Sequence, residues 1–398
     1  MYIPREAESH LIRLAKQFPV VAVLGPRQSG KSTLAKKTFP EYAYVSMEHL
    51  GIRRKAQEDP EGFFATYADK PGMIIDEIQE APELFSYMQG IVDQGYRPGY
   101  FIVTGSQNFL LHEKITQTLA GRIALLTLLP LTIDELQQAQ LLPETLEQLL
   151  FKGCYPRLYA EPFDTHLWLS NYISTYIEKD VRQMLRITDV VAFQKFLTLC
   201  AARVGNLLNY AELARDADIS PNTAKAWISL LEASYIITLL QPYHKNFNKR
   251  IVKSPKLYFH DTGLVCELLG IQSAHELHTH SIRGHLFESL IVSQFCKYRF
   301  NQGENPHIYF WRDVQGHEID CVIEKSFTEI IPLEIKSSMT ISNSFFKGLE
   351  SWNEISQQNG ISYVVYAGKD DFLGTQGQTY SWMHLHTMLN KMYTRVKA

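Results

Sequence analysis

Cysteine is scarce in this chain of 398 residues, with five copies. They are odd in number, lie far apart and form no C-x-x-C pair, which argues against a disulfide framework and against a zinc finger. Long apolar runs are also lacking, because the longest, residues 123–131, falls well short of a bilayer span. The first residues show no secretion signal. We therefore expect a soluble cytoplasmic protein in a reducing compartment, without membrane contact.

A strong excess of one charge is missing as well, since 39 basic residues stand against 42 acidic residues. Residues 151–270 carry 14 basic and 11 acidic side chains, whereas the segments before and after them are acidic. This distribution excludes a general polyanion-binding surface but allows a local basic patch in the middle of the chain. The length predicts two to four domains of ordinary globular composition, at roughly 100–200 residues each.

Short apolar segments alternate with polar helical stretches in the first third of the chain. Strands are expected at residues 19–24, 42–47, 73–75 and 100–103. Strands separated by helices predict a parallel sheet with helices on both faces. A proline and a helix N-cap within Leu129–Glu135 mark the end of this domain, which we assign to residues 1–135.

The rest of the chain predicts three further parts: a helical linker over residues 136–200, a helix–turn–helix with a β-ribbon over 201–270, and an α/β domain over 281–398. Ser220 is the expected N-cap of the second helix of the helix–turn–helix, Pro221–Ala233. The ribbon strands are expected at residues 236–243 and 256–260. The fold class is therefore α/β.

A phosphate-binding motif follows the first predicted strand. Residues Gly25–Ser32 match G-x-x-x-x-G-K-[ST] between a strand and a helix. Its glycines let backbone N–H groups surround a phosphate, while Lys31 reaches the β/γ oxygens and Ser32 ligates Mg²⁺. A plain glycine turn is the alternative. The expected nucleotide-binding residues are Gly25, Pro26, Arg27, Gln28, Ser29, Gly30, Lys31, Ser32 and Thr33.

Polar residues end the next two strands of the predicted sheet. Asp76 would hold the metal ion or its water, and Glu77 would orient or deprotonate the attacking water. Thr104 or Ser106 could hydrogen-bond the γ-phosphate or that water. ATP and Mg²⁺ are therefore the expected cofactors. A small-molecule kinase fits less well, because Glu77 suits water activation.

These motifs resemble the AAA+ ATPases, with Walker A at Gly25–Ser32, Walker B at Asp76–Glu77 and a sensor-1-like position at Thr104–Ser106. More narrowly, the chain is similar to a prokaryotic family that fuses this domain to a winged helix and a restriction-endonuclease-like domain. The resemblance implies that Arg122 is an arginine finger or a sensor, acting in cis or in trans. An ion pair with a local carboxylate is the equal alternative. Action in trans would require a homo-oligomer on ATP binding.

A helix–turn–helix followed by a ribbon is a DNA-binding pattern. Exposed positions of Pro221–Ala233 suited to phosphates and base edges are Asn222, Thr223 and Lys225. The ribbon loop is basic and contains no acid, and its cations are Lys245, Lys249, Arg250, Lys253 and Lys256. DNA is therefore an expected partner, contacted through its backbone. Docking of a protein partner is the alternative.

Three acids and a lysine in the last domain suggest a metal site. Residues two apart in a strand project from one face, so Glu334 and Lys336 should emerge together, and Asp320 precedes them at a spacing suited to adjacent strands. The acids would hold Mg²⁺ or Mn²⁺, Lys336 would position or activate water, and Glu288 would hold a metal-bound water or a second ion.

This acidic pattern resembles the PD-(D/E)XK nucleases, although Ile319 stands where that family has proline. Cleavage and a retained fold without cleavage both remain open. The expected function is Mg²⁺-dependent ATP hydrolysis coupled to DNA engagement, with a nuclease-like C-terminal domain. The alternative is an ATP-gated signalling or protein-docking ATPase with an inactive nuclease fold.

Overall fold

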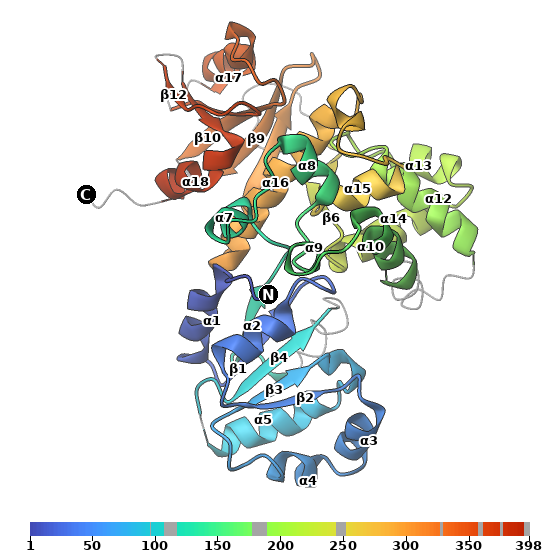
Figure 1. Cartoon of the computed structure of the whole chain (residues 1–398), viewed down its shortest axis with the longest axis vertical. Coiled ribbons are helices and arrows are strands. Elements are labelled where there is room, and N and C mark those ends of the chain that lie inside the picture. Colours follow the sequence, from blue (N-terminus) through green and yellow to red (C-terminus); the bar gives the residue numbers. More distant parts are fainter. Residues whose placement is uncertain are drawn as a thin grey trace. The chain divides into compact units, whose positions relative to one another are not determined.

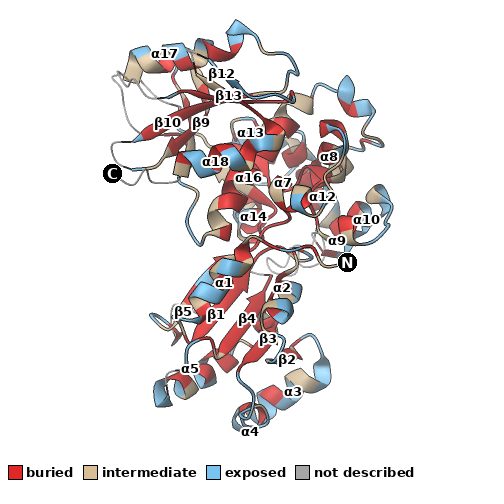
Figure 2. Ribbon diagram, turned by 60° about the vertical axis from the view of Figure 1, so that its left-hand side comes forward, coloured by how far each residue is buried: buried red, intermediate tan, exposed pale blue. Residues whose placement is uncertain are grey.

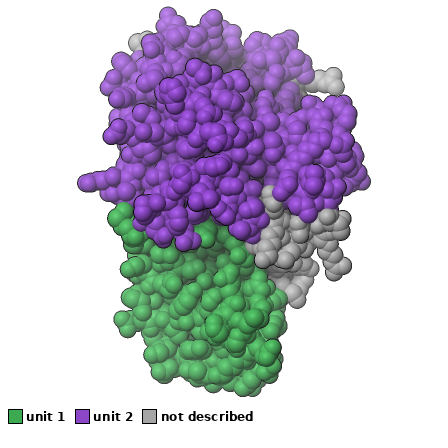
Figure 3. Space-filling view, turned by 45° about the vertical axis from the view of Figure 1, so that its right-hand side comes forward, with its two compact units in different colours: residues 1–131, 233–235, 299–304 green, residues 132–232, 236–298, 305–398 purple. Residues whose placement is uncertain are grey.

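The computed structural model describes eight stretches of the chain, which are residues 1–95, 97–106, 118–176, 189–243, 252–326, 329–356, 361–374 and 377–393. The chain divides into two compact units (Figure 3). Unit 1 comprises residues 1–131, 233–235 and 299–304, and unit 2 comprises residues 132–232, 236–298 and 305–398. No helix in the described ranges is both long and apolar enough to span a membrane.

Unit 1 is built on a five-stranded sheet in which all neighbouring strands run parallel (Figure 1). Its strands are β1 (Val20–Leu24), β2 (Ala43–Ser46), β3 (Met73–Asp76), β4 (Phe101–Gly105) and β5 (Ile123–Thr127). Their order is β2-β3-β4-β1-β5, so the chain switches from one side of β1 to the other. In open sheets of this kind, ligands bind at the carboxyl ends of the strands.

Helices cover both faces of this sheet, as the sequence predicts. On one face, α1 (Ala7–Ala15) and α2 (Lys31–Thr38) share a buried core with residues of β1. On the other face, Phe64 of α4 (Pro60–Ala65) packs edge-on against Phe101, with ring centroids 5.5 Å apart. The remaining helices are α3 (Leu50–Glu58), η1 (Ile78–Glu80) and α5 (Leu84–Gln94). β1, β3 and β4 are buried along their whole length (Figure 2), as strands covered on both faces must be.

Unit 2 opens with a helical stretch. Its helices are α7 (Ile133–Gln138), α8 (Leu146–Lys152), α9 (Arg157–Ala160), α10 (Thr165–Tyr172) and α12 (Val190–Ala201). Capping boxes start α7 and α8, where Thr132 and Thr145 accept hydrogen bonds from the backbone N–H groups of the N3 residues. Helix α7 begins before the predicted start of the helical linker at residue 136, and the division between the two compact units falls after residue 131.

A helix–turn–helix and a ribbon follow, as predicted. The two helices are α13 (Tyr210–Asp216) and α14 (Pro221–Ala233), and Ser220 Oγ accepts the Thr223 N–H at 3.0 Å, which confirms the expected N-cap. The ribbon pairs β6 (Ile237–Leu240) with β7 (Lys256–Phe259) in antiparallel fashion. Helix α15 (Thr262–Leu268) comes next.

The C-terminal part of unit 2 contains a six-stranded mixed sheet of order β12-β13-β11-β10-β9-β8. Its strands are β8 (Ile308–Arg312), β9 (Glu318–Glu324), β10 (Ile330–Lys336), β11 (Tyr363–Tyr366), β12 (Phe372–Leu373) and β13 (Gln378–Ser381). The associated helices are η3 (Glu276–His278), α16 (Arg283–Asn301), η4 (Asn343–Phe346), α17 (Lys347–Ser356), η5 (Trp382–His384) and α18 (Leu385–Tyr393). Buried Trp311 and Trp352, with ring centroids 5.4 Å apart, belong to the core between the sheet and α17.

Candidate nucleotide and metal sites

The phosphate-binding motif lies between β1 and α2, at the carboxyl edge of the unit 1 sheet. Gly25 and Gly30 have φ values of +152° and +96°, a backbone region that favours glycine. A Cβ on Gly25 would lie 2.1 Å from the carbonyl oxygen of Leu128. The tight turn therefore requires glycine, and it ends at the N-terminus of α2, where backbone N–H groups favour an anion.

Two features of this loop suit a phosphate ligand. Arg5 donates to the carbonyl oxygens of Ser29 at 2.6 Å and Leu129 at 2.7 Å, which fixes the loop from its buried side. The buried Ser29 hydroxyl has no hydrogen-bond partner in the described part of the chain. An unpaired buried hydroxyl costs about 1–3 kcal/mol. The loop thus retains polar capacity for a ligand oxygen.

Lys31 is buried, and its Nζ donates to the carbonyl oxygen of Pro26 at 2.8 Å. Burial lowers the pKa of Lys31, while the carboxylates of Glu77 and Asp76 act in the opposite direction. Its ammonium group is therefore poorly solvated and suited to an anionic partner. Three other residues of the motif are more exposed than Lys31, namely Arg27, Gln28 and Thr33. Arg27 pairs with Glu48 at 3.5 Å, Gln28 adopts a positive φ, and Thr33 lies on α2.

Asp76 gathers three hydroxyl groups at the end of β3. Ser32 Oγ donates to its Oδ1 at 2.5 Å, and the Tyr44 hydroxyl donates to its Oδ2 at 2.7 Å. The Thr104 hydroxyl also contacts Oδ1. Burial and the hydrogen bond to Asp76 raise the pKa of Tyr44, which therefore stays a donor. Carboxylate and hydroxyl oxygens are ligands that Mg²⁺ takes, so Ser32 and Asp76 fit the expected ion.

Glu77 stands beside Asp76 in a left-handed backbone conformation, with φ +52°, which is unusual for a residue other than glycine. Its Oε2 accepts a hydrogen bond from Ser106 Oγ at 3.2 Å, and its N–H donates to Thr104 Oγ1 at 3.3 Å. The side chain of Gln79 also contacts this carboxylate. The polar residues expected at the ends of β3 and β4 therefore do meet, at the same edge as the phosphate loop.

Arg122 lies at the opposite edge of the sheet, which argues against action in cis, one of the alternatives that the sequence left open. Ile123 of β5 pairs with Val20 at the start of β1, whereas the phosphate loop follows Leu24 at the other end. A five-residue strand spans roughly 16 Å. Arg122 Nε instead contacts Asp93 Oδ1 at 2.6 Å, the local carboxylate pairing that the sequence left open.

Asp320 and Glu334 meet on adjacent strands of unit 2, as predicted. The antiparallel register pairs Cys321 of β9 with Leu333 of β10, so Asp320 and Glu334 come next to each other at the following position. Asp320 Oδ2 accepts hydrogen bonds from the Ile335 N–H at 2.8 Å and from Lys336 Nζ at 3.4 Å. Lys336 also contacts Glu334, which confirms that both side chains leave β10 on one face.

The two carboxyl groups differ in their affinity for a proton. Burial and the neighbouring Asp320 raise the pKa of Glu334 to about 9. Burial acts in the same direction on Asp320, but the ammonium groups of Lys336 and Lys256 hold its pKa below the ordinary value. A Cβ on Gly348 of α17 would lie 2.2 Å from Glu334 Oε1, so this glycine makes room for the carboxylate. Two adjacent acids that repel each other suit a divalent cation.

Glu288 was expected beside this site, but its partner Lys256 was not. Glu288 lies on α16, and its Oε1 accepts hydrogen bonds from Lys256 Nζ at 2.9 Å and from the Tyr258 hydroxyl at 2.5 Å. Lys256 Nζ also lies 2.5 Å from Glu318 Oε1. The expected contact of Lys256 with a phosphate backbone is therefore wrong, because this lysine is buried among carboxylates.

The other residues expected to contact DNA differ in exposure. Asn222 and Lys225 are exposed on α14, and Lys253 is exposed ahead of β7. The Thr223 hydroxyl is partly buried and hydrogen-bonds Ser220 Oγ at 2.7 Å, so it serves the helix start. Three further cations of the ribbon loop lie outside the described residues, namely Lys245, Lys249 and Arg250.

Several residues of both sites escaped prediction. Glu318 stands two residues before Asp320 on one strand, so the alternation of strand side chains could have indicated it. Tyr44 and Tyr258 lie within expected strands, but nothing in their local sequence marks them as partners of an acid. Arg5 and Gly348 belong to no recognisable sequence motif. Their roles depend on contacts with residues distant in the chain.

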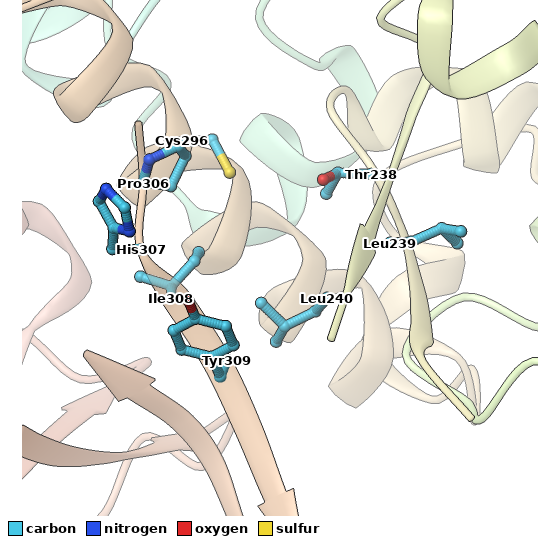
Figure 4. A pocket seen from close by; sticks show the side chains of 8 residues that line it. All are labelled: Thr238, Leu239, Leu240, Cys296, Pro306, His307, Ile308 and Tyr309. Atoms are coloured by element: carbon cyan, nitrogen blue, oxygen red, sulfur yellow. The ribbon is translucent and has the colours of Figure 1, made fainter. Parts of the chain in front are cut away.

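A hollow of about 190 Å³ lies in unit 2 between β6 and β8 (Figure 4). Its lining is mainly apolar and includes Leu239, Leu240, Cys296, Ile308 and Tyr309. None of the charged residues of the acidic site lines it.

The chain is similar to known proteins along most of its length. Residues 17–137 match a family described as AAA domain, and residues 143–275 and 283–385 match two domains of unknown function, DUF8612 and DUF4143. Uncharacterized protein Mb2031c of Mycobacterium bovis and Uncharacterized protein Rv2008c of Mycobacterium tuberculosis are each 30% identical over 376 residues, which cover 92% of this chain and 81% of the relative.

Solved structures resemble the chain more distantly. The Walker-type ATPase PABY2304 of Pyrococcus abyssi is 17% identical, covers 67% of this chain and 96% of its own, and has a TM-score of 0.45. AMPPCP-bound DnaA from Aquifex aeolicus is 13% identical, covers 57% and 85%, and has a TM-score of 0.31. The chain belongs to the same family as the two mycobacterial proteins, and with its N-terminal AAA domain it is an AAA-type ATPase.

Proposed function

We propose that this protein hydrolyses ATP with Mg²⁺, couples the nucleotide cycle to DNA engagement, and carries a nuclease-like metal site in unit 2. The observation that supports hydrolysis is the meeting of Ser32, Asp76 and Glu77 beside the phosphate loop. Ser32 and Asp76 hold Mg²⁺, which neutralises phosphate charge when bound. Lys31 binds the β/γ oxygens, and Glu77 orients the attacking water and takes its proton.

The position of Glu77 supports this assignment. Ser106 and Gln79 both contact its Oε2, and Thr104 links its backbone N–H to the carboxylate of Asp76. A carboxylate fixed at a defined distance from the metal-binding Asp76 can align a water with the γ-phosphate. The Thr104 hydroxyl contacts Asp76 and accepts the Glu77 N–H, so it positions both acids.

In unit 2 we propose a PD-(D/E)XK-like site. Asp320 and Glu334 hold one divalent ion, Mg²⁺ or Mn²⁺, which activates water when bound. Lys336 Nζ contacts both carboxylates and positions that water. Burial and, after it, the neighbouring Asp320 carboxylate raise the pKa of Glu334, and a divalent ion between the two acids would relieve their repulsion.

We further propose that α13, α14 and the β6–β7 ribbon form a winged helix that contacts DNA. Asn222 and Lys225 are exposed on α14, and Lys253 is exposed beside the ribbon. These side chains suit phosphate contacts that are independent of base sequence. The proposal also includes ATP-dependent assembly of several copies, in which Arg122 reaches the nucleotide of a neighbouring copy.

A second candidate function is an ATP-gated docking protein in which unit 2 cleaves nothing. The observation that favours it is that Glu288 pairs with Lys256 and Tyr258. The carboxylate expected near the metal is therefore already engaged by protein side chains. In this case the helix–turn–helix and the ribbon would bind a protein.

ATP hydrolysis measured with and without a panel of duplex, single-stranded and branched DNA separates the two functions. We expect DNA to stimulate hydrolysis, and the stimulation to fall steeply as salt rises. Glu77→Gln serves as the control that removes hydrolysis without removing the DNA-contacting surface. DNA coupling would be rejected in favour of docking if no nucleic acid changed the rate of hydrolysis and no salt-dependent DNA binding were measured.

A further inference from the structure

A lysine from the ribbon lies inside the acidic site of unit 2. Lys256 Nζ is 2.9 Å from Glu288 Oε1 and 2.5 Å from Glu318 Oε1. The side chain is only 5% exposed, so bulk water does not solvate its charge. A buried ammonium group is tolerated when carboxylates compensate it, as they do here.

The position of Lys256 is fixed by the ribbon itself. In β7, Lys256 pairs with Leu240 of β6, and Tyr258 pairs with Thr238. Lys256 and Tyr258 are two residues apart and therefore share a strand face. Both donate to the same oxygen of Glu288, and Nζ also lies 5.6 Å from the ring centroid of Phe310.

The two lysines of the site make direct contacts with different pairs of carboxylates. Lys336 contacts Asp320 and Glu334 on strands β9 and β10. Lys256 contacts Glu288 and Glu318, and Arg312 also pairs with Glu318, at 3.3 Å from its Oε2. A second divalent ion at Glu288 would have to displace Lys256 or lie directly beside its positive charge, and like charges at such distances repel strongly.

We propose that Lys256 is a built-in cation that takes the place of a second metal ion beside Glu288, so that the acidic site holds a single divalent ion, at Asp320 and Glu334. The inference rests on the metal site of the proposed function and specifies its occupancy. Lys256 acts as a positioning residue, because its ion pair would keep the Glu288 carboxylate from serving as a ligand of the ion. The ribbon thereby contributes a charged group to a site otherwise built by the C-terminal sheet and α16.

Counting bound Mn²⁺ tests this inference. Full-length protein without nucleotide is titrated with Mn²⁺ alone, and free Mn²⁺ is measured by electron paramagnetic resonance. The number of ions held at the acidic site is the number bound by the unsubstituted protein minus the number bound by Asp320→Asn. We expect one ion in the unsubstituted protein and a second in Lys256→Gln, with the second lost again when Glu288→Gln is added. Lys253→Gln removes a nearby exposed lysine and should still hold one ion.

Glu288→Gln alone provides a test if Lys256→Gln does not fold. We expect it to retain one ion with an affinity within threefold of the unsubstituted protein, because Glu288 is not a ligand. A tenfold or greater loss would overturn the inference, as would two ions in the unsubstituted protein or one ion in folded Lys256→Gln. Two ions would leave the proposed metal site standing. No ion in the unsubstituted protein would overturn that site and the role of Lys256 with it.

Discussion

Ser32 and Asp76, 44 residues apart in the chain, are joined by a hydrogen bond of 2.5 Å between Oγ and Oδ1. Ser32 lies in the first turn of helix α2 and Asp76 ends strand β3, so the bond links the two motifs of the nucleotide site. It places a hydroxyl and a carboxylate where one Mg²⁺ can take both as ligands. The fold of unit 1 thus brings together, without a nucleotide, two residues suited to binding Mg²⁺.

Lys31 and Glu77 should have separable effects on ATP turnover. Lys31→Ala should lose nucleotide binding, because the buried ammonium is the cation aimed at phosphate. Glu77→Gln should bind ATP with Mg²⁺ but hydrolyse it about 10²–10⁴-fold more slowly, the usual contribution of a general base. Binding by calorimetry and phosphate release measure the two effects. Glu48→Gln is a matched control that should hydrolyse normally, and unchanged turnover in Glu77→Gln would remove Glu77 from the mechanism.

Arg122→Ala should reduce hydrolysis by a factor on the order of 10³ or more if Arg122 reaches a neighbouring copy. Stability should change by no more than about 1 kcal/mol, because the pair with Asp93 is exposed. Mixing Arg122→Ala with Lys31→Ala should restore part of the activity, since one variant keeps the phosphate loop and the other keeps the arginine. A strictly monomeric, fully active protein would contradict action in trans.

Neutralising exposed cations of the helix–turn–helix region should weaken DNA binding in a salt-dependent way. Lys225→Gln and Lys253→Gln should each lower the slope of log affinity against log salt by about one. Lys249 and Arg250 are expected to act similarly. Lys195→Gln is the control, because that exposed lysine already pairs with Asp218 at 2.5 Å. Equal slopes in all variants would assign this surface to another partner.

Gly348→Ala should weaken divalent metal binding in unit 2. The added Cβ would lie 2.2 Å from Glu334 Oε1 and force this carboxylate to move. Displacing the support of a metal ligand typically costs about 10–100-fold in affinity. Gly284→Ala on α16 is the matched control, since its Cβ would make an ordinary contact of 3.6 Å with Ser337 Oγ. Mn²⁺ titration compares the two, and equal affinities would mean that Glu334 does not hold the ion.

His260 should make the protein less stable in mild acid. Burial, assisted by the charge of Lys297, lowers the pKa of His260 from 6.5 to about 3. Between pH 6.5 and about 3, His260 therefore binds a proton in the unfolded chain but not in the folded chain. The free energy of unfolding is at its full value above pH 6.5 and falls as the pH drops toward 3. The slope from this residue approaches about 1.4 kcal/mol per pH unit.

Urea unfolding of the unsubstituted protein and of His260→Gln between pH 5 and 7.5 checks this prediction. The difference between their unfolding free energies should narrow as pH falls, because the glutamine does not titrate. His280→Gln replaces a more exposed histidine and should keep the original pH dependence. A pH-independent difference between His260→Gln and the unsubstituted protein would mean that folding does not change the pKa of His260.

The nucleotide site was predictable because its chemistry is local. Gly25–Ser32 is one continuous motif, and Asp76 and Thr104 each end an apolar strand. Parallel strands place their carboxyl ends at one edge, so the pattern of strands was enough to bring these residues together. Asp320, Glu334 and Lys336 were predictable for a similar reason, since strand alternation and a hairpin-length spacing relate them.

Residues whose roles depend on packing between distant segments were not predictable. Lys256 has the sequence surroundings of a basic loop, and nothing near it indicates that β7 delivers it to Glu288 on α16. Arg122 has a family motif, but its place at the far edge of the sheet follows from β5, a strand that the sequence analysis did not assign. Such positions depend on which elements become neighbours rather than on the pattern of any one of them.

The hydrogen bonds of Arg5 determine where the ATP-binding part of this chain can be cut. The match to the AAA domain begins at residue 17, beyond both Arg5 and helix α1. A fragment started there would leave the carbonyl groups of Ser29 and Leu129 without their donor and would uncover the apolar core beneath Leu11. Recombinant versions of this domain should therefore include Arg5 and the whole of α1 rather than start at residue 17.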